Sequence, residues 1–176
     1  PRERHDRRGD SVDVSLVAKD LPGDSAVFYT SPTAGAHWVS TNAKEHKDWA
    51  LATYRKLRQL AAVPQAFVQA YPLYYGDIVP AGHTPPRFDE PWYKDAVDGY
   101  RYLGTDPRFP DVQNLFVFTS YTISTTLYLV YLLSELRRRG VAVRRQTLSS
   151  LEEALRTPLP SAAGSAGAPP AHVVNS

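Results

Sequence analysis

The sequence predicts an α/β protein, and three observations carry this prediction. Apolar and polar residues alternate along 12–18, which is the period of a strand. A second strand is expected at 141–147, directly after a helix that ends in three arginines and Gly140. The strand–helix–strand order around 124–147 is typical of a parallel sheet with crossover helices.

Helix signals occur in three places. Asn42 is a candidate N-cap, with Glu45 three residues later as in a capping box, and Pro64 ends this helix. A second helix starts at Ser124 or Thr125 and ends in the arginines 137–139. A further helical turn is expected at Ser150 with Glu153. The first helix is amphipathic, and its expected buried face consists of Trp49, Ala50, Thr53, Tyr54, Leu57, Leu60 and Ala61.

The remaining segments differ in character. Residues 65–110 are rich in proline and aromatic side chains, which favours short strands and loops, and a strand is expected at 115–121. Residues 1–10 are charged and predict a disordered arm, and residues 157–170 predict a flexible loop. Residues 171–175 have the pattern of a buried strand.

Composition limits the function classes. The chain contains no cysteine, so it has no disulfide framework and no thiolate chemistry. The net charge of +2 and two short arginine clusters give no strong argument for nucleic acid, and no apolar run is long enough to span a membrane. The five histidines lack metal-ligand spacing, which predicts no metal. The absence of methionine and the start at Pro1 suggest processing or truncation.

Four segments together resemble the D-amino-acid oxidase family, and most of all its fungal members. They are VSLVAKDLP at 14–22, SPTAGAHW at 31–38, PWYKDAVDGYRYL at 91–103 and the stretch 118–151, and HVVN at 172–175 adds to them. The resemblance implies a partial Rossmann-like FAD-binding domain with the beginning of a mixed-sheet substrate domain. The FAD-binding domain would comprise 11–63 and 120–176, and the substrate domain 64–119, after the arm at 1–10.

The chain departs from the family pattern at both ends. The family opens with a strand, a G-x-G-x-x-G loop and a helix, and this motif is not found in the sequence. The family's catalytic tyrosines and arginine lie beyond the point that matches Ser176. The expectation is therefore a chain truncated at both ends, with no catalytic residue and no turnover of its own. A sheet without its first strand would be unstable, prone to aggregation, or completed by another chain.

The resemblance also implies a set of FAD-binding residues. Lys19 and Asp20 follow the first strand, where an acid accepts hydrogen bonds from the adenosine ribose; the alternative is a solvated turn. Ala34, Gly35 and Ala36 would lie at the isoalloxazine ring, followed by His37 and Trp38; the alternative is an ordinary loop of small residues. Leu148 would lie against the adenine; the alternative is a plain strand end.

The implied activity is FAD-dependent oxidative deamination of D-amino acids to imino and oxo acids, with dioxygen as oxidant and hydrogen peroxide as product. The resemblance leaves open a D-aspartate preference and a homodimer in the complete enzyme. It implies a peroxisomal or cytoplasmic location, although the residues 174–176 are not the peroxisomal address signal. Alternatives are a non-catalytic relative that binds a protein partner through its aromatic segment and, third, a basic nucleic-acid binder.

Overall fold

The computed structural model describes residues 14–40 and 44–158, and the chain forms two compact units. The first unit contains the chain up to Thr30 and from Leu129 onward, and the second contains Ser31–Tyr128. The expected arm 1–10, the Asn42 cap and the strand 171–175 lie outside the described residues. No helix in the described part of the chain is long and apolar enough to cross a membrane.

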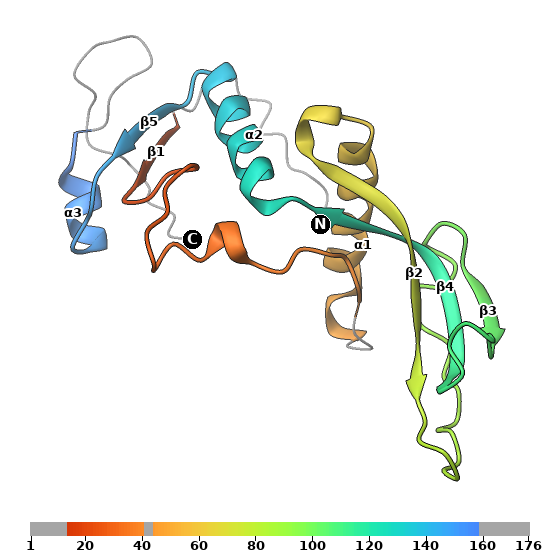
Figure 1. Ribbon diagram of the computed structural model, residues 1–176. Helices are drawn as coiled ribbons and strands as arrows, with labels where there is room; N and C mark the ends of the chain where they lie inside the picture. Colours follow the sequence, from red (N-terminus) through yellow and green to blue (C-terminus); the bar gives the residue numbers. More distant parts are fainter. Residues whose placement is uncertain (1–13, 41–43, 159–176) are drawn as a thin grey trace. The chain divides into compact units, whose positions relative to one another are not determined.

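The first unit is organised around a parallel strand pair. Strand β1 (Ser15–Ala18) pairs with β5 (Ala142–Arg145) over its whole length, with Ala18 opposite Arg145 (Figure 1). This pairing confirms the predicted parallel sheet. The turn expected after β1 is also present, because the Asp24 N–H donates to the Leu21 carbonyl at 3.0 Å.

Helix α2 (Thr125–Arg138) leads into β5 and ends as the sequence predicts. Gly140 has a positive φ of 80°, and its N–H donates to the Arg137 carbonyl at 2.9 Å. The Val141 N–H donates to the Leu136 carbonyl at 3.0 Å. These two bonds form a Schellman motif, in which glycine adopts the left-handed conformation at little cost.

The expected last turn forms helix α3 (Leu151–Arg156). The Ser150 hydroxyl accepts a hydrogen bond from the Glu153 N–H at 3.1 Å, so Ser150 is the N-cap. Glu153 in turn accepts from the Ser149 N–H at 2.7 Å. The Ser150–Glu153 prediction is therefore confirmed.

The second unit is a three-stranded antiparallel sheet with a helix packed on it. The strand order is β2 (Val68–Ile78), β4 (Val112–Ile123) and β3 (Arg101–Gly104), and helix α1 (Lys47–Ala61) packs on β2 and β4 (Figure 1). The strand expected at 115–121 is present as part of β4, but it belongs to this antiparallel sheet and not to the parallel one. β2 is eleven residues long, whereas short strands were expected.

Helix α1 buries only part of its predicted face. Tyr54, Leu57 and Leu60 are buried, whereas Thr53 is exposed and Trp49 is 70% exposed. The prediction was wrong for Trp49 because this residue lies in the first turn, where its ring stacks on His46 at 4.9 Å instead of on the sheet. Tyr54 ties the helix to the sheet, since its hydroxyl donates to the Thr119 carbonyl at 2.9 Å.

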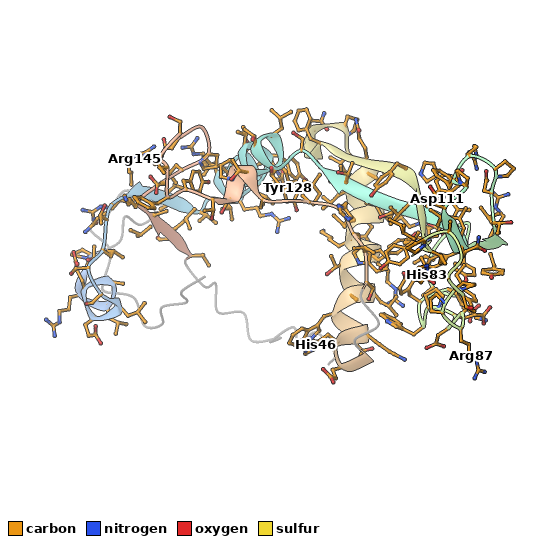
Figure 2. All side chains as sticks on the ribbon, turned by 60° about the horizontal axis from the view of Figure 1, so that its bottom comes forward. His46, His83, Arg87, Asp111, Tyr128 and Arg145 are labelled. Atoms are coloured by element: carbon orange, nitrogen blue, oxygen red, sulfur yellow. The ribbon has the colours of Figure 1, made fainter. Side chains whose placement is uncertain are left out.

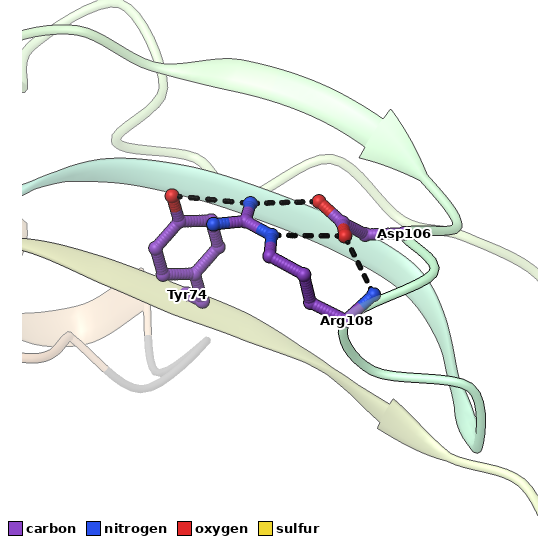
Figure 3. A network of polar contacts seen from close by, with 3 residues as sticks. All are labelled: Tyr74, Asp106 and Arg108. Atoms are coloured by element: carbon purple, nitrogen blue, oxygen red, sulfur yellow. Dashed lines mark hydrogen bonds and ion pairs between the residues drawn. The ribbon is translucent and has the colours of Figure 1, made fainter.

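A polar network fixes the connection from β3 to β4 (Figure 3). Arg108 donates to both carboxylate oxygens of Asp106, at 3.0 Å through Nε and 2.7 Å through Nη2, and to the Tyr74 hydroxyl at 3.3 Å. The Arg108 guanidinium lies over the Tyr74 ring, 4.9 Å from its centroid. Arg108, by its side chain and then its backbone N–H, lowers the pKa of Asp106 to about 2.

The boundaries of the two units, after Thr30 and Tyr128, differ from the predicted domain boundaries at residues 63 and 119. Helix α1 packs on the antiparallel sheet, although its residues were assigned to the predicted FAD-binding domain. The division of the chain into an FAD-binding domain and a substrate domain stays a prediction.

Candidate functional site

In the first unit the candidate residues lie at the carboxyl edge of the parallel strand pair. Because β1 and β5 are parallel, the residues that follow each strand lie at the same edge of the sheet. The Gln146 N–H donates to the Ala18 carbonyl at 3.0 Å and extends the pairing beyond β5. Lys19 and Asp20 follow β1 directly, with Lys19 exposed and Asp20 half-buried. This edge is where ligands bind in open α/β sheets.

An ion pair closes this edge. Arg145 at the end of β5 binds both carboxylate oxygens of Asp24, with a distance of 2.9 Å from Nη2 to Oδ1, and also donates to the Lys19 carbonyl at 3.3 Å. Arg145, followed by the Leu21 N–H, lowers the pKa of Asp24 to about 2. Burial raises the pKa of Tyr29, and the charges of Asp24 and Asp20 raise it further. The turn after β1 is thereby fixed to the end of β5.

Leu148 and Gln146 lie just beyond β5. Leu148 is half-buried. Gln146 has a buried Oε1 atom for which the described residues provide no hydrogen-bond donor. An orphaned buried acceptor costs free energy unless a group from outside these residues satisfies it. Gln146 also lines an open hollow of about 550 Å³, together with Arg144 and Arg156.

In the second unit the Ala34–Trp38 loop is fixed along β4. The Ala36 carbonyl accepts from the Ile123 N–H at 2.8 Å and from the Thr122 hydroxyl at 3.1 Å. The Trp38 N–H donates to the Tyr121 carbonyl at 2.9 Å. These bonds form an antiparallel bridge between His37 and Thr122, so the loop follows the end of β4 with a defined backbone.

Trp38 anchors this loop in the core. Its side chain is only 6% exposed, and its indole N–H donates to the Ala50 carbonyl of α1 at 3.0 Å. Its ring meets those of Tyr54, Tyr93 and Phe118 edge-on, at centroid distances of 4.8, 5.5 and 6.1 Å. The described structure therefore assigns the Trp38 ring to packing, whereas His37 is exposed.

Gly35 is not required by the packing of this chain. A Cβ atom built on Gly35 would meet no heavy atom within 4 Å. Gly35 is also not among the glycines with positive φ. Neither crowding nor backbone conformation explains glycine at this position.

The structure thus groups the candidate residues within each unit. Lys19 and Asp20 share the carboxyl edge of the first unit with the chain just after β5, and Ala34–Trp38 form one fixed segment in the second. Sequence reasoning missed Asp24 and Gln146 at the first edge. The parallel pairing of the two strands would have indicated Gln146, because it is the first residue beyond β5.

No protein-family model matches the chain. It is 31% identical to the D-amino-acid oxidase of Fusarium vanettenii over 150 residues, and this alignment covers 80% of the chain. The chain is a relative of the D-amino-acid oxidases. A bacterial D-amino-acid oxidase, from Rubrobacter xylanophilus, is also 31% identical, over 144 residues and 80% of the chain. The chain spans 42% and 41% of the length of these two oxidases.

Proposed function

We propose that this chain is part of an FAD-dependent D-amino-acid oxidase and contributes residues that hold FAD. The complete protein would convert a D-amino acid, dioxygen and water into a 2-oxo acid, ammonia and hydrogen peroxide, by way of an imino acid. The observation that carries the proposal is the 31% identity to D-amino-acid oxidases over 80% of the chain. Bound FAD would supply the acceptor for the hydride that leaves the substrate Cα.

The carboxyl edge of the first unit suits the adenosine part of FAD. The Asp20 carboxylate would accept hydrogen bonds from the ribose hydroxyls, beside Lys19. The chain at Leu148 would lie against the adenine. The adenine amino group is a donor of the kind that the orphaned Gln146 Oε1 lacks among the described residues. This unsatisfied acceptor is the structural feature that supports a nucleotide at this edge.

The Ala34–Trp38 loop suits the flavin ring. Small side chains at Ala34, Gly35 and Ala36 would allow the backbone to approach a flat ring, and the N–H groups would hydrogen-bond to it. The open surroundings of Gly35 agree with this role, since no contact among the described residues requires glycine there. His37 lies in the same segment, and Trp38 would hold the loop in position from the core.

The remaining assignments of the proposal follow from the same family. Residues 11–63 with 120–176 would serve FAD binding, and residues 64–119 would form part of the substrate domain. The partners would be the D-amino acid and dioxygen, with no nucleic acid or membrane, and the complete enzyme would form a homodimer in a peroxisomal or cytoplasmic location. No residue of this chain is assigned a catalytic role.

A titration of the purified chain with FAD, followed by flavin fluorescence, tests the proposal. Saturable binding is expected. The substitution Asp20→Ala should weaken FAD binding by about tenfold, because it removes a charge-assisted hydrogen bond of about 1.5 kcal/mol. Gly35→Val should also weaken it, because its side chain would occupy the open space above the loop. The matched control is Asp95→Ala, an exposed acid far along the chain. A folded chain that binds no FAD would refute the proposal.

A second candidate is a non-catalytic relative that binds a protein partner through its aromatic segment. It is favoured by exposed apolar side chains on β2, where Tyr75 is 51% and Ile78 is 80% exposed. A stable complex with a defined partner that persists without flavin, and that Ile78→Lys abolishes, would support this candidate. If the chain binds FAD and such a partner does not affect this binding, the result would count against the second candidate.

A further inference from the structure

A hollow in the second unit borders the core that holds Trp38, because Ser40 and Tyr93 line it, but it contains none of the residues 34–38. It has a volume of about 280 Å³ and lies between the β2–β4 ribbon and the segment 86–91. Four aromatic side chains line it: Tyr75, Phe88, Tyr93 and Phe116. The charged side chains of its lining are Asp77, Asp89 and Arg87.

The aromatic rings form the inner wall of this hollow. Phe116 and Tyr93 are only 5% and 2% exposed, yet both line it, so the hollow reaches into the packed part of the unit. The rings of Tyr75 and Phe88 are inclined to Phe116 at centroid distances of 5.5 and 6.2 Å. Aromatic faces carry negative electrostatic potential, so a wall of this kind attracts cations.

Asn114 lines the hollow and connects the segments around it. This residue has a left-handed φ of 52°, which is uncommon outside glycine. Its side-chain amide donates to Asp77 Oδ2 and to the Pro86 carbonyl, both at 2.8 Å, and so joins β2, β4 and the segment that covers the hollow. The first of these bonds fixes the Asp77 carboxylate, which lines the hollow.

A β-bulge places consecutive β2 residues around the hollow. The register shifts between Tyr75 and Asp77, and Tyr75, Gly76 and Asp77 all line the hollow. Successive residues of a regular strand point to opposite faces, and a bulge relaxes this alternation. Glycine is required at the bulge, because a Cβ atom on Gly76 would lie 2.6 Å from Val112 Cγ1 and 2.8 Å from the Gln113 carbonyl oxygen.

The charges of the lining favour a positive ligand. The lining contains two carboxylates and one guanidinium, and the Arg87 side chain is exposed and extends outward from the ribbon (Figure 2). Asp77 and Asp89 therefore stand beside an aromatic wall at the hollow, which is the combination that recognises organic ammonium groups. The hollow's volume of about 280 Å³ is several times the roughly 30 Å³ share of one water molecule, so it has room for a small organic ion.

We propose that this hollow is a binding site for a small organic ammonium ion with an apolar stem. The stem lies against Phe116 and Tyr93, and the ammonium group lies at the rim between Tyr75 and the carboxylates of Asp77 and Asp89. The proposal does not require FAD, because none of the lining residues is a candidate FAD-binding residue, although Tyr93 packs on Trp38. Its failure would thus leave the proposed function intact.

The test is an amide NMR titration of the 176-residue chain with phenethylammonium, without FAD. The amides of Gly76, Phe88 and Asn114 should shift saturably, with a dissociation constant of about 1–10 mM for a ligand of this size. The anion 3-phenylpropanoate, which has a similar stem and the opposite charge, should bind at least about tenfold more weakly.

Variants separate the charge and aromatic contributions. Asp89→Asn, at an exposed position, should weaken phenethylammonium binding by about threefold to fivefold, and Tyr75→Leu should also weaken it. Arg87→Gln is the matched control and should leave binding equal or tighter. Asp77→Asn provides a second charge variant. Equal binding of the anion, shifts confined to other amides, or affinity unchanged in both aspartate variants would overturn the proposal.

Discussion

At the residue scale, two glycines of the second unit occupy opposite environments. Gly76 lies in the β2 bulge, where a Cβ atom would meet Val112 and the Gln113 carbonyl below 3 Å. Gly35 lies in the candidate flavin loop, where a Cβ atom would meet nothing within 4 Å. Contacts among the described residues therefore explain the glycine at position 76 but not the one at position 35.

This contrast predicts different costs for the same substitution. Gly76→Ala should lower the free energy of unfolding by about 1–3 kcal/mol, because the new methyl group overpacks against backbone. Gly35→Ala is the control and should leave stability within about 0.5 kcal/mol of the native chain. Urea unfolding of both variants measures the difference. Equal stability of the two variants would show that the bulge does not have the described geometry.

The carboxylate of Asp106 predicts a pH dependence of stability. Its pKa is lowered from an ordinary 3.8 to about 2 by Arg108. A carboxyl group with a depressed pKa in the folded state stabilises the fold above its ordinary pKa, and this contribution is lost as the pH falls through the folded value. The contribution of Asp106 should thus be present at pH 5 and vanish near pH 2.

Urea midpoints of the native chain and Asp106→Asn, measured from pH 5 to pH 2, test this dependence. The variant should be less stable at pH 5, and the two curves should converge as the pH approaches 2. Asp95→Asn serves as the control, because Asp95 is exposed. A constant difference between the Asp106 variant and the native chain over this range would contradict the assignment.

At the element scale, the candidate flavin loop depends on helix α1 through Trp38. Its indole bonds to the Ala50 carbonyl and packs on Tyr54. Trp38→Ala should lower the free energy of unfolding by about 3–5 kcal/mol, as for other large buried aromatics. Trp49→Ala, at a position that is 70% exposed on the same helix, should cost far less. Chemical denaturation of both variants gives the comparison, and similar losses would contradict the described burial of Trp38.

Local sequence patterns predicted where helices and strands lie better than they predicted which strands pair with each other. The alternation at 12–18, the Gly140 stop and the Ser150 cap depend on neighbouring residues, and the structure confirms the strand at Ser15–Ala18, the stop and the cap. The pairing of the strand 115–121 with β2 instead of a parallel neighbour depends on contacts between distant segments, which periodicity does not encode. Trp49 fits the amphipathic period, but the first turn of α1 leaves it exposed.

In the candidate site, too, local sequence segments could be identified from the sequence, whereas contacts between distant residues could not. Asp20 and the small residues 34–36 were found from the family segments that contain them. The Arg145–Asp24 pair joins residues 121 positions apart, and the Gln146 acceptor is orphaned only in the folded chain, so both needed the structure. The sequence therefore supplied the candidate segments, which stay predictions, and the structure showed which side chains hold them in place.

At the scale of the whole molecule, the proposed function divides FAD recognition between residues of different units. The candidate adenosine-binding residues Lys19, Asp20 and Leu148 belong to the first unit, and the candidate flavin-binding residues Ala34–Trp38 belong to the second. Each part of the cofactor should then protect its own segments when it is supplied alone. ADP represents the adenosine side, and riboflavin represents the flavin ring.

Hydrogen exchange with mass spectrometry tests this division directly. ADP should slow amide exchange at 14–24 and 142–150 and leave 31–38 unchanged, because its predicted contacts lie at the carboxyl edge of β1 and β5. Riboflavin should slow exchange at 31–38 alone. Asp20→Ala should remove the effect of ADP while preserving that of riboflavin, and Gly35→Val should do the reverse. The assignment of residues to the two parts of FAD is wrong if either ligand protects the segments assigned to the other. It is also wrong if one variant abolishes both effects while the chain remains folded. Either result would count against the assignment even if the chain binds FAD.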